Sequence, residues 1–193
     1  MLVEAVRYFN WVDVLVIMIS VKIIYTSLKN GVVVELFKLS GALLSLYICL
    51  HYYTVVSDTL RKNMGLKTMP LDFLDFLIFL SLFIISYVSF VVLRAVFFRL
   101  VKMQTVPRLN KFGGLLLGMG RIIALSSTIV YMLAICTISY IERSAQTSYF
   151  GKDLFQISVN TYGWLWNTFA SKFMLDEKFN KTVLEIQKGF LRK

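Results

Sequence analysis

Residues 73–92 read FLDFLIFLSLFIISYVSFVV, a continuous apolar run in which Asp75 is the single charged residue. A helix needs about 20 apolar residues to cross the hydrocarbon core of a bilayer, because each residue adds about 1.5 Å. The rest of the chain is similar: 58% of its 193 residues are hydrophobic and 17% are charged, against roughly 25% charged residues in an ordinary soluble domain. This composition predicts an all-α integral membrane protein in contact with the lipid bilayer.

Three other stretches are apolar enough to form spans of their own. Together with the first run they predict a membrane domain of about four spans within residues 1–145. The expected bounds of the spans are 11–28, 32–53, 73–93 and 115–141. The apolar character of the last one begins earlier, so its glycine-rich entrance, residues 112–121, is expected to be a re-entrant or interfacial segment or an extension of the span.

Basic residues in the connections predict the orientation. The third connection contains no acid, and its basic residues are Arg94, Arg99, Lys102, Arg108 and Lys111, whereas the second contains Arg61, Lys62 and Lys67. Because positively charged loops tend to stay in the cytoplasm, we expect both termini to be extracytoplasmic. The leader carries Glu4 as well as Arg7 and no small-residue cleavage site follows, which favours a retained first span over a signal peptide.

Residues 146–193 differ in composition from the spans. The segment 149–173 is rich in aromatic residues and is interrupted by Gly163, which favours a helix at the membrane interface, where Trp and Tyr concentrate, over a fifth span. The tail, residues 176–193, has apolar residues at helical spacing and lysines between them. These apolar residues are Phe179, Val183, Ile186 and Phe190. We expect a basic amphipathic helix that docks on the membrane or on the protein itself.

Charged residues inside spans are costly and therefore suggest a role. Asp13 opens the first span, where the helix dipole favours a carboxylate, and Lys22 lies deeper, where its long side chain can reach the interface. Arg121 shares a helix face with Gly114 and Gly118, a small-xxx-small pair that allows close helix packing. We expect Arg121 to pair with Glu35, with Asp13 as the second choice of partner and an unpaired, snorkelling arginine as the alternative.

The sequence lacks the residues that catalytic triads and metal sites need. His51 is the only histidine, and Cys49 and Cys136 both lie in apolar runs, so we expect no catalytic triad, metal site or cofactor. His51 is interpreted as a hydrogen-bonding residue at the interface, not as a base. The net charge of +10 is expected from basic cytoplasmic loops, and we expect no binding of nucleic acid.

Four groups of residues form a recognisable set: Trp11-Val12-Asp13, Gly31 with Glu35, His51-Tyr52-Tyr53-Thr54, and Asn110-Lys111-x-x-Gly114-x-x-x-Gly118-x-x-Arg121. With these residues at this spacing, the chain resembles the colicin V production protein (CvpA) family of small bacterial inner-membrane proteins. The resemblance covers about residues 11–140. It implies a part in the production or export of the peptide toxin colicin V and in envelope homeostasis, through a secretion or envelope protein partner or as a homo-oligomer.

The chain also departs from the pattern of this family. Asn110 stands where an acid is usual and Lys111 where an arginine is usual, so a role that needs an acid at position 110 is not expected here. Asn30, Val34 and Ile122 are further departures. The leading hypothesis is a non-enzymatic membrane protein. The alternatives are a channel or carrier whose path is lined by Glu35, Arg121 and Lys22, and a membrane enzyme.

Overall fold

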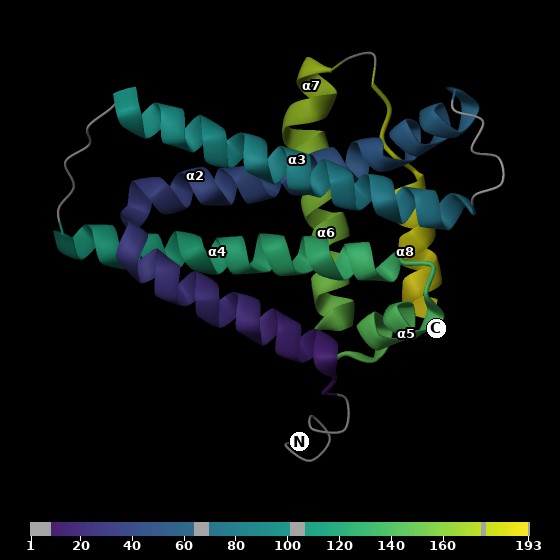
Figure 1. Cartoon of the computed structure of the whole chain (residues 1–193), viewed down its shortest axis with the longest axis horizontal. Coiled ribbons are helices and arrows are strands. Elements are labelled where there is room, and N and C mark those ends of the chain that lie inside the picture. The colour runs from purple at the N-terminus through teal and green to yellow at the C-terminus, as the bar shows by residue number, and fades with distance from the viewer. Residues whose placement is uncertain (1–8, 64–69, 101–106, 175–176, 193) are drawn as a thin grey trace.

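The structure, a computed structural model, describes residues 9–63, 70–100, 107–174 and 177–192 (Figure 1). These residues form helices and the turns between them, with no strand among them, which confirms the all-α class. The helices are α2 (Trp11–Asn63), α3 (Leu71–Leu100), α4 (Pro107–Ala134), α5 (Ser139–Thr147), α6 (Gly151–Leu165), α7 (Ser171–Phe173) and α8 (Thr182–Arg192). Of the residues named above, Glu4, Arg7, Lys67 and Lys102 lie outside the described residues, as do both ends of the expected tail, residues 176 and 193.

The predicted first two spans are the two limbs of α2, which bends at Gly31. Gly31 has φ 76° and ψ 173°, a conformation that is open to glycine and strained for residues with a Cβ. From this bend the limbs diverge (Figure 1). We call them the first limb, residues 11–30, and the second limb, residues 32–63.

The prediction of four separate spans is not confirmed. Among the described residues, three helices are long and apolar enough to cross a membrane: α2 with 53 residues, α3 over Leu71–Arg99 and α4 over Asn110–Ala134. The sequence alone does not reveal that the break after residue 28 is a bend within one helix. A single glycine provides the change of direction for which a loop was expected.

Residues 112–121 are part of α4, the last of the alternatives given above, because the helix is continuous from Pro107 to Ala134. The expected end of the span near residue 141 is wrong, because the helix ends at Ala134 and α5 begins at Ser139. Residues 135–138 are apolar enough to extend the predicted span, but β-branched Ile135, Thr137 and Ile138 have low helix propensity.

Glycines on α4 allow it to approach the first limb of α2 closely. A Cβ at Gly114 would lie 2.9 Å from the carbonyl oxygen of Ser27 and 3.2 Å from the Cα of Gly31, and a Cβ at Gly118 would overlap the Ser27 side chain. The predicted small-xxx-small packing is therefore confirmed. On the other side, α3 packs against the second limb, where Gly41 faces Phe90.

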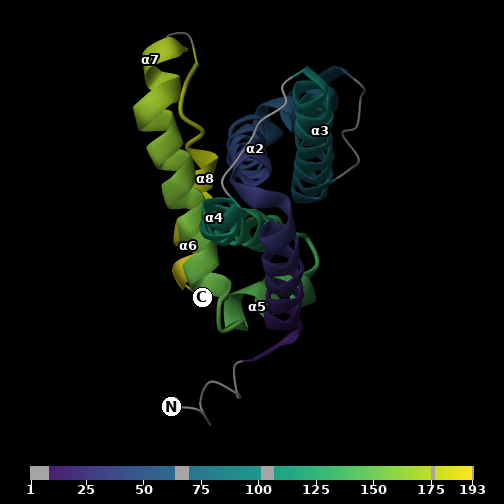
Figure 2. The same cartoon turned by 90° about the vertical axis from the view of Figure 1, so that its left-hand side faces the viewer.

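The C-terminal region packs on the long helices. Helix α6 crosses them, and α2 lies between α6 and α3 (Figures 1 and 2). Gly163 does not break α6, which continues through a π-helical turn, Trp166–Ala170, into α7. Phe155 of α6 stacks on Tyr131 of α4 at 5.3 Å and on Phe190 of α8 at 4.2 Å. The expected C-terminal amphipathic helix therefore exists and docks on the protein itself.

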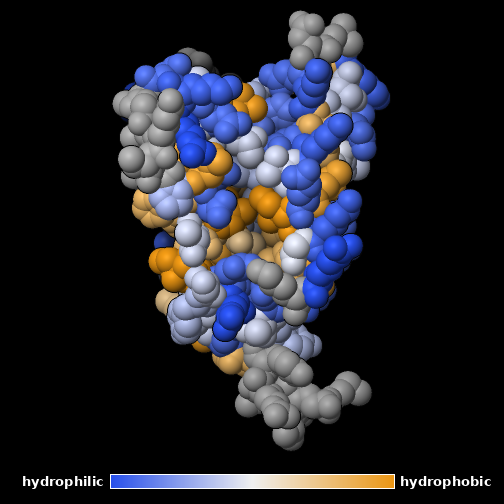
Figure 3. All heavy atoms as spheres, turned by 90° about the vertical axis from the view of Figure 1, so that its right-hand side faces the viewer, coloured by the Kyte–Doolittle hydropathy of each residue, from blue (hydrophilic) through white to orange (hydrophobic). Residues whose placement is uncertain are grey.

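One end of the molecule contains the end of α2, the start of α3, and α5 and α8 (Figure 1). Its surface is mostly hydrophilic, with apolar side chains in the middle and along one side (Figure 3). The other end contains the bend of α2, the end of α3 and the beginning of α4 (Figure 1). The long apolar helices therefore run between these two ends.

Candidate functional site

Arg121 and Glu35 form an ion pair between α4 and the second limb of α2. Arg121 Nη1 lies 3.1 Å from Glu35 Oε2, and the side chains are 4% and 0% exposed. The predicted pairing is confirmed. Asp13, the second choice of partner, binds elsewhere, and Arg121 is not an unpaired snorkelling side chain.

Each member of the ion pair has further partners near the bend. Asn30 Nδ2 donates a hydrogen bond to Glu35 Oε1 at 2.9 Å, and Lys38 Nζ donates to the same oxygen at 3.2 Å. Arg121 Nη2 donates to Thr26 Oγ1 at 3.1 Å. These five residues, which we call the bend cluster, connect both limbs of α2 to α4.

Asn110 satisfies the backbone at the bend itself. Its Oδ1 accepts a hydrogen bond from the N–H of Val32 at 2.7 Å, and its side chain lies against Gly31. An N–H left unsatisfied in a buried place costs about 1–3 kcal/mol, so this contact stabilises the bend. The side chain at position 110 therefore acts as a hydrogen-bond acceptor. An asparagine can accept this hydrogen bond without carrying a charge. Lys111 is exposed and lies outside the bend cluster.

Asp13 connects the start of α2 to the start of α6. With Asn10 it forms a capping box, in which Asn10 N donates to Asp13 Oδ2 at 2.9 Å and Val12 N donates to Asn10 Oδ1 at 2.8 Å. The buried carboxylate also accepts hydrogen bonds from Ser148 Oγ at 2.6 Å and from the N–H groups of Tyr149 and Phe150. Asp13 thus has the expected role at a helix N-terminus and also holds the turn before α6.

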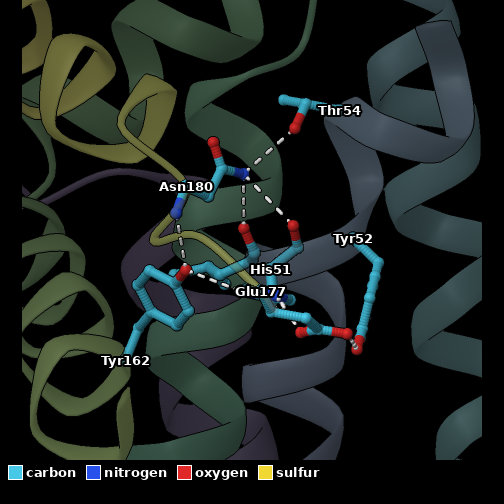
Figure 4. A network of polar contacts seen from close by, with 7 residues as sticks. His51, Tyr52, Thr54, Tyr162, Glu177 and Asn180 are labelled. Carbon is cyan, nitrogen blue, oxygen red and sulfur yellow. Dashed lines mark hydrogen bonds and ion pairs between the residues drawn. The ribbon is translucent and has the colours of Figure 1, made fainter. Parts of the chain in front are cut away.

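His51 lies inside the protein, and it is the hydrogen-bonding residue that the sequence predicts. Its ring is 5% exposed and stacks between Tyr47 at 5.2 Å and Trp166 at 5.3 Å. Its Nε2 lies 2.6 Å from Glu177 Oε2 and its Nδ1 lies 2.9 Å from Tyr162 Oη (Figure 4). The π-helical turn that begins at Trp166 brings the indole onto the imidazole.

The chain segment before α8 completes this second cluster. Tyr52 donates its hydroxyl hydrogen to Glu177 Oε1 at 2.6 Å, and Asn180 Nδ2 donates to the carbonyl oxygen of Leu50 at 2.8 Å (Figure 4). We call the group of His51, Tyr52, Tyr162, Glu177 and Asn180 the tail clasp. It attaches the C-terminal tail to the second limb of α2.

The hydrogen bonds of the tail clasp indicate where its protons lie. The N–H of Asn180 donates to Tyr162 Oη at 3.0 Å, which leaves the hydroxyl hydrogen of Tyr162 for His51 Nδ1. Nε2 of His51 faces the carboxylate of Glu177, which as an acceptor takes the hydrogen of Nε2–H. The hydrogen bond from Tyr52, helped by the one from His51, lowers the pKa of Glu177 against the opposing effect of burial. Burial raises the pKa of Tyr162.

A carboxylate, an imidazole and a hydroxyl in this order resemble the chain of groups in a catalytic triad. The hydroxyl of Tyr162 belongs, however, to a fully buried side chain. A substrate has no access to it in this arrangement. The geometry suits attachment of the tail.

The partners of the predicted site residues were not foreseen from the sequence. They include Asn10, Thr26, Ser148, Tyr162, Glu177 and Asn180. Polar residues in apolar or aromatic stretches, such as Thr26 and Tyr162, could have drawn attention. No signal in a single sequence connects Asp13 to Ser148 or His51 to Glu177, because these contacts join distant segments.

Together these features define a helical membrane protein whose long helices meet at a buried ion pair beside a glycine bend. The family model described as Colicin V production protein matches residues 12–158. The chain belongs to this family. No curated protein and no solved structure gave a match. The matched residues include the whole bend cluster, whereas Tyr162, Glu177 and Asn180 of the tail clasp lie beyond them.

Proposed function

We propose that the chain is a non-enzymatic protein of the bacterial inner membrane that supports production or export of a colicin V type toxin and envelope homeostasis. It acts through partner proteins or as a small oligomer. The observation that carries this proposal is the family match over residues 12–158. Three long apolar helices agree with a place in the membrane.

The bend cluster favours a rigid scaffold within this proposal. Glu35 and Arg121 are buried and paired, and Asn30, Lys38 and Thr26 supply further contacts. Separating a buried ion pair leaves an uncompensated buried charge, which costs about 3–5 kcal/mol, so the pair favours one arrangement of the two helices. The bend cluster therefore fixes the angle between the limbs of α2, and partner proteins would recognise the resulting surface.

The proposed orientation places the bend in or near the cytoplasmic interface. Lys29 and Lys38 flank the bend, Arg94 and Arg99 lie in the last turns of α3, and Lys111 lies near the start of α4. These elements meet at one end of the molecule (Figure 1). Positive charge collected at one end of the spans supports a cytoplasmic position for that end.

A transport component is the second candidate. A cavity of about 340 Å³ lies beside the ion pair, and its lining includes Lys22, Thr26, Lys38 and Arg121. A polar path through the membrane would need such a space. The two candidates differ in whether water reaches this cavity during function.

The toxin-related role is tested in a bacterial strain that lacks its own family member and produces a peptide toxin of this class. We expect the chain to restore secreted toxin and resistance to a membrane-active detergent. Arg121→Gln should abolish both effects, and Lys111→Gln, which removes a charge outside the bend cluster, should abolish neither. Normal toxin secretion in the strain without the chain would contradict the role.

Thiol labelling separates the scaffold from the carrier. In a background with Cys49→Ala and Cys136→Ala, a cysteine at position 26 should react with a membrane-impermeant maleimide if a water-filled path exists. A cysteine at position 130, where Val130 is fully buried, serves as the unreactive control. The scaffold predicts no reaction at position 26 in intact membranes, and rapid reaction there would favour the carrier.

A further inference from the structure

Two adjoining cavities lie between the limbs of α2, α3 and α4. The larger, about 340 Å³, is the one beside Arg121, and the smaller, about 160 Å³, has Arg94 in its lining. Lys38 and Tyr87 line both. The cavities therefore meet around these two side chains, next to the bend cluster.

The charge around these cavities is unbalanced. Their basic lining residues are Lys22, Lys38, Arg94 and Arg121, and neither lining contains an acid. Glu35, the acid of the bend cluster, compensates one of these four charges. Several positive charges around one partly buried space repel one another and lack a counter-charge, so the arrangement favours an anion in the cavities.

Arg121 also has an unused donor. Its Nη1 faces Glu35 and its Nη2 binds Thr26, but its buried Nε has no hydrogen-bond partner within the part of the chain that the structure describes. A guanidinium is a preferred ligand for phosphate because its N–H groups are arranged as a planar fork. The side chain that lines the larger cavity thus retains capacity for one more acceptor oxygen.

Apart from Thr26 and Tyr87, the remaining walls of the cavities are apolar. Ile19, Ile23 and Phe83 contribute to the larger cavity, and Phe90 and Val91 to the smaller. On the outer side of α3, Ile84, Ile85, Val88 and Val92 are exposed. Basic side chains beside apolar ones suit an amphiphilic ligand. Its anionic headgroup would contact the basic side chains, and its acyl chains would lie along the apolar residues.

We propose that these cavities bind a phosphate group through Lys22, Lys38, Arg94 and the free donor of Arg121. Two sources share this chemistry: the headgroup of an anionic phospholipid and free inorganic phosphate. The apolar walls favour the lipid. The site is independent of the toxin-related role, since a protein could bind phosphate here whether or not it serves toxin export.

Native mass spectrometry of the purified full chain in detergent tests the proposal, with phosphatidylglycerol and phosphatidylcholine added in equal amounts. We expect retention of phosphatidylglycerol over phosphatidylcholine, and a reduction of this retention by about tenfold in Arg94→Gln. The matched control is Arg99→Gln, which removes the same group from an exposed position on the same helix and should change retention less than twofold.

A thermal unfolding series with inorganic phosphate distinguishes the two sources, with sodium chloride at the same ionic strength as the reference. Stabilisation by phosphate and displacement of phosphatidylglycerol would identify a site for free phosphate as well. No displacement would assign the site to the lipid. Equal loss of retention in Arg94→Gln and Arg99→Gln, or no preference for phosphatidylglycerol together with no phosphate effect, would overturn the proposal.

If Arg94→Gln does not fold, Lys22→Gln provides the same test, because the Lys22 side chain is exposed at the cavity. Loss of phosphatidylglycerol binding with normal toxin secretion would leave the toxin-related role intact. Loss of toxin secretion in a variant with normal lipid binding would leave the lipid site intact and would show that toxin secretion depends on another part of the protein.

Discussion

His51 Nε2 lies 2.6 Å from Glu177 Oε2, so a residue in the second limb of α2 holds the segment that leads into α8. The same carboxylate accepts a hydrogen bond from Tyr52. Three bonded side chains therefore join the C-terminal tail to the family-matched part of the chain. This relationship gives the tail a defined place on the protein.

Removing this carboxylate should loosen the tail. In Glu177→Ala the hydrogen bonds to His51 and Tyr52 are lost, and docking of α8 should weaken by about 1–2 kcal/mol. Hydrogen exchange of residues 182–192 in the detergent-solubilised protein would report this change. Lys178→Ala, at the exposed neighbouring position, is the control. Equal protection of α8 in both variants would show that the clasp does not hold the tail.

The tail clasp should also depend on pH. The pKa of Glu177 in the folded protein lies below its ordinary value of 4.5, first because of the hydrogen bond from Tyr52 and then because of His51. A lowered carboxyl pKa means that the stabilisation is complete above pH 4.5 and is lost as the pH falls through the folded pKa. Fluorescence of Trp166, with Trp11→Phe and Trp164→Phe in the same chain, should change in that acidic range. A transition that persists unchanged in Glu177→Gln would contradict this assignment.

The bend of α2 should require glycine at position 31. Gly31→Ala places a Cβ at φ 76° and against the Asn110 side chain, and strain of this kind costs about 1–3 kcal/mol before the overlap is added. Thermal unfolding should therefore occur at a clearly lower temperature. Gly163→Ala is the matched control, because a Cβ there meets nothing within 4 Å and alanine favours the helix. Equal effects of the two substitutions would contradict the role of the bend.

Asp13 should hold the turn before α6 through its charge. In Asp13→Asn an NH₂ group replaces one oxygen, so at least one of the donors from Asn10, Ser148, Tyr149 and Phe150 loses its acceptor. We expect a loss of about 2 kcal/mol or more in the free energy of unfolding. Asp153→Asn, at an exposed position of α6, should cost much less. Similar losses would mean that Asp13 contributes only as a surface charge.

The sequence was most informative where local patterns decide structure. The long apolar runs predicted membrane helices, and the face shared by Gly114, Gly118 and Arg121 predicted both the close packing of α4 and the pairing with Glu35. In these cases the spacing along one helix determines which side chains lie together.

Hydropathy was least informative at the ends and bends of helices. Residues 135–138 are as apolar as a span, so the end of α4 at Ala134 has no hydropathic signal. Likewise, the difference between a bend and a loop at Gly31 depends on its contact with Asn110. The tail clasp depends on contacts between distant segments, and periodicity carries no information about these.

The central claim is that the Glu35–Arg121 ion pair holds the bend of α2 against α4. A double-mutant cycle of thermal unfolding with Glu35→Gln, Arg121→Gln and the double variant tests it most directly. Each single substitution leaves a buried charge without its main partner and should cost about 3–5 kcal/mol. The account predicts that the double variant is at least as stable as the less stable of the two single variants. The coupling free energy between the two substitutions should be about 2 kcal/mol or more. Purely additive losses would contradict it.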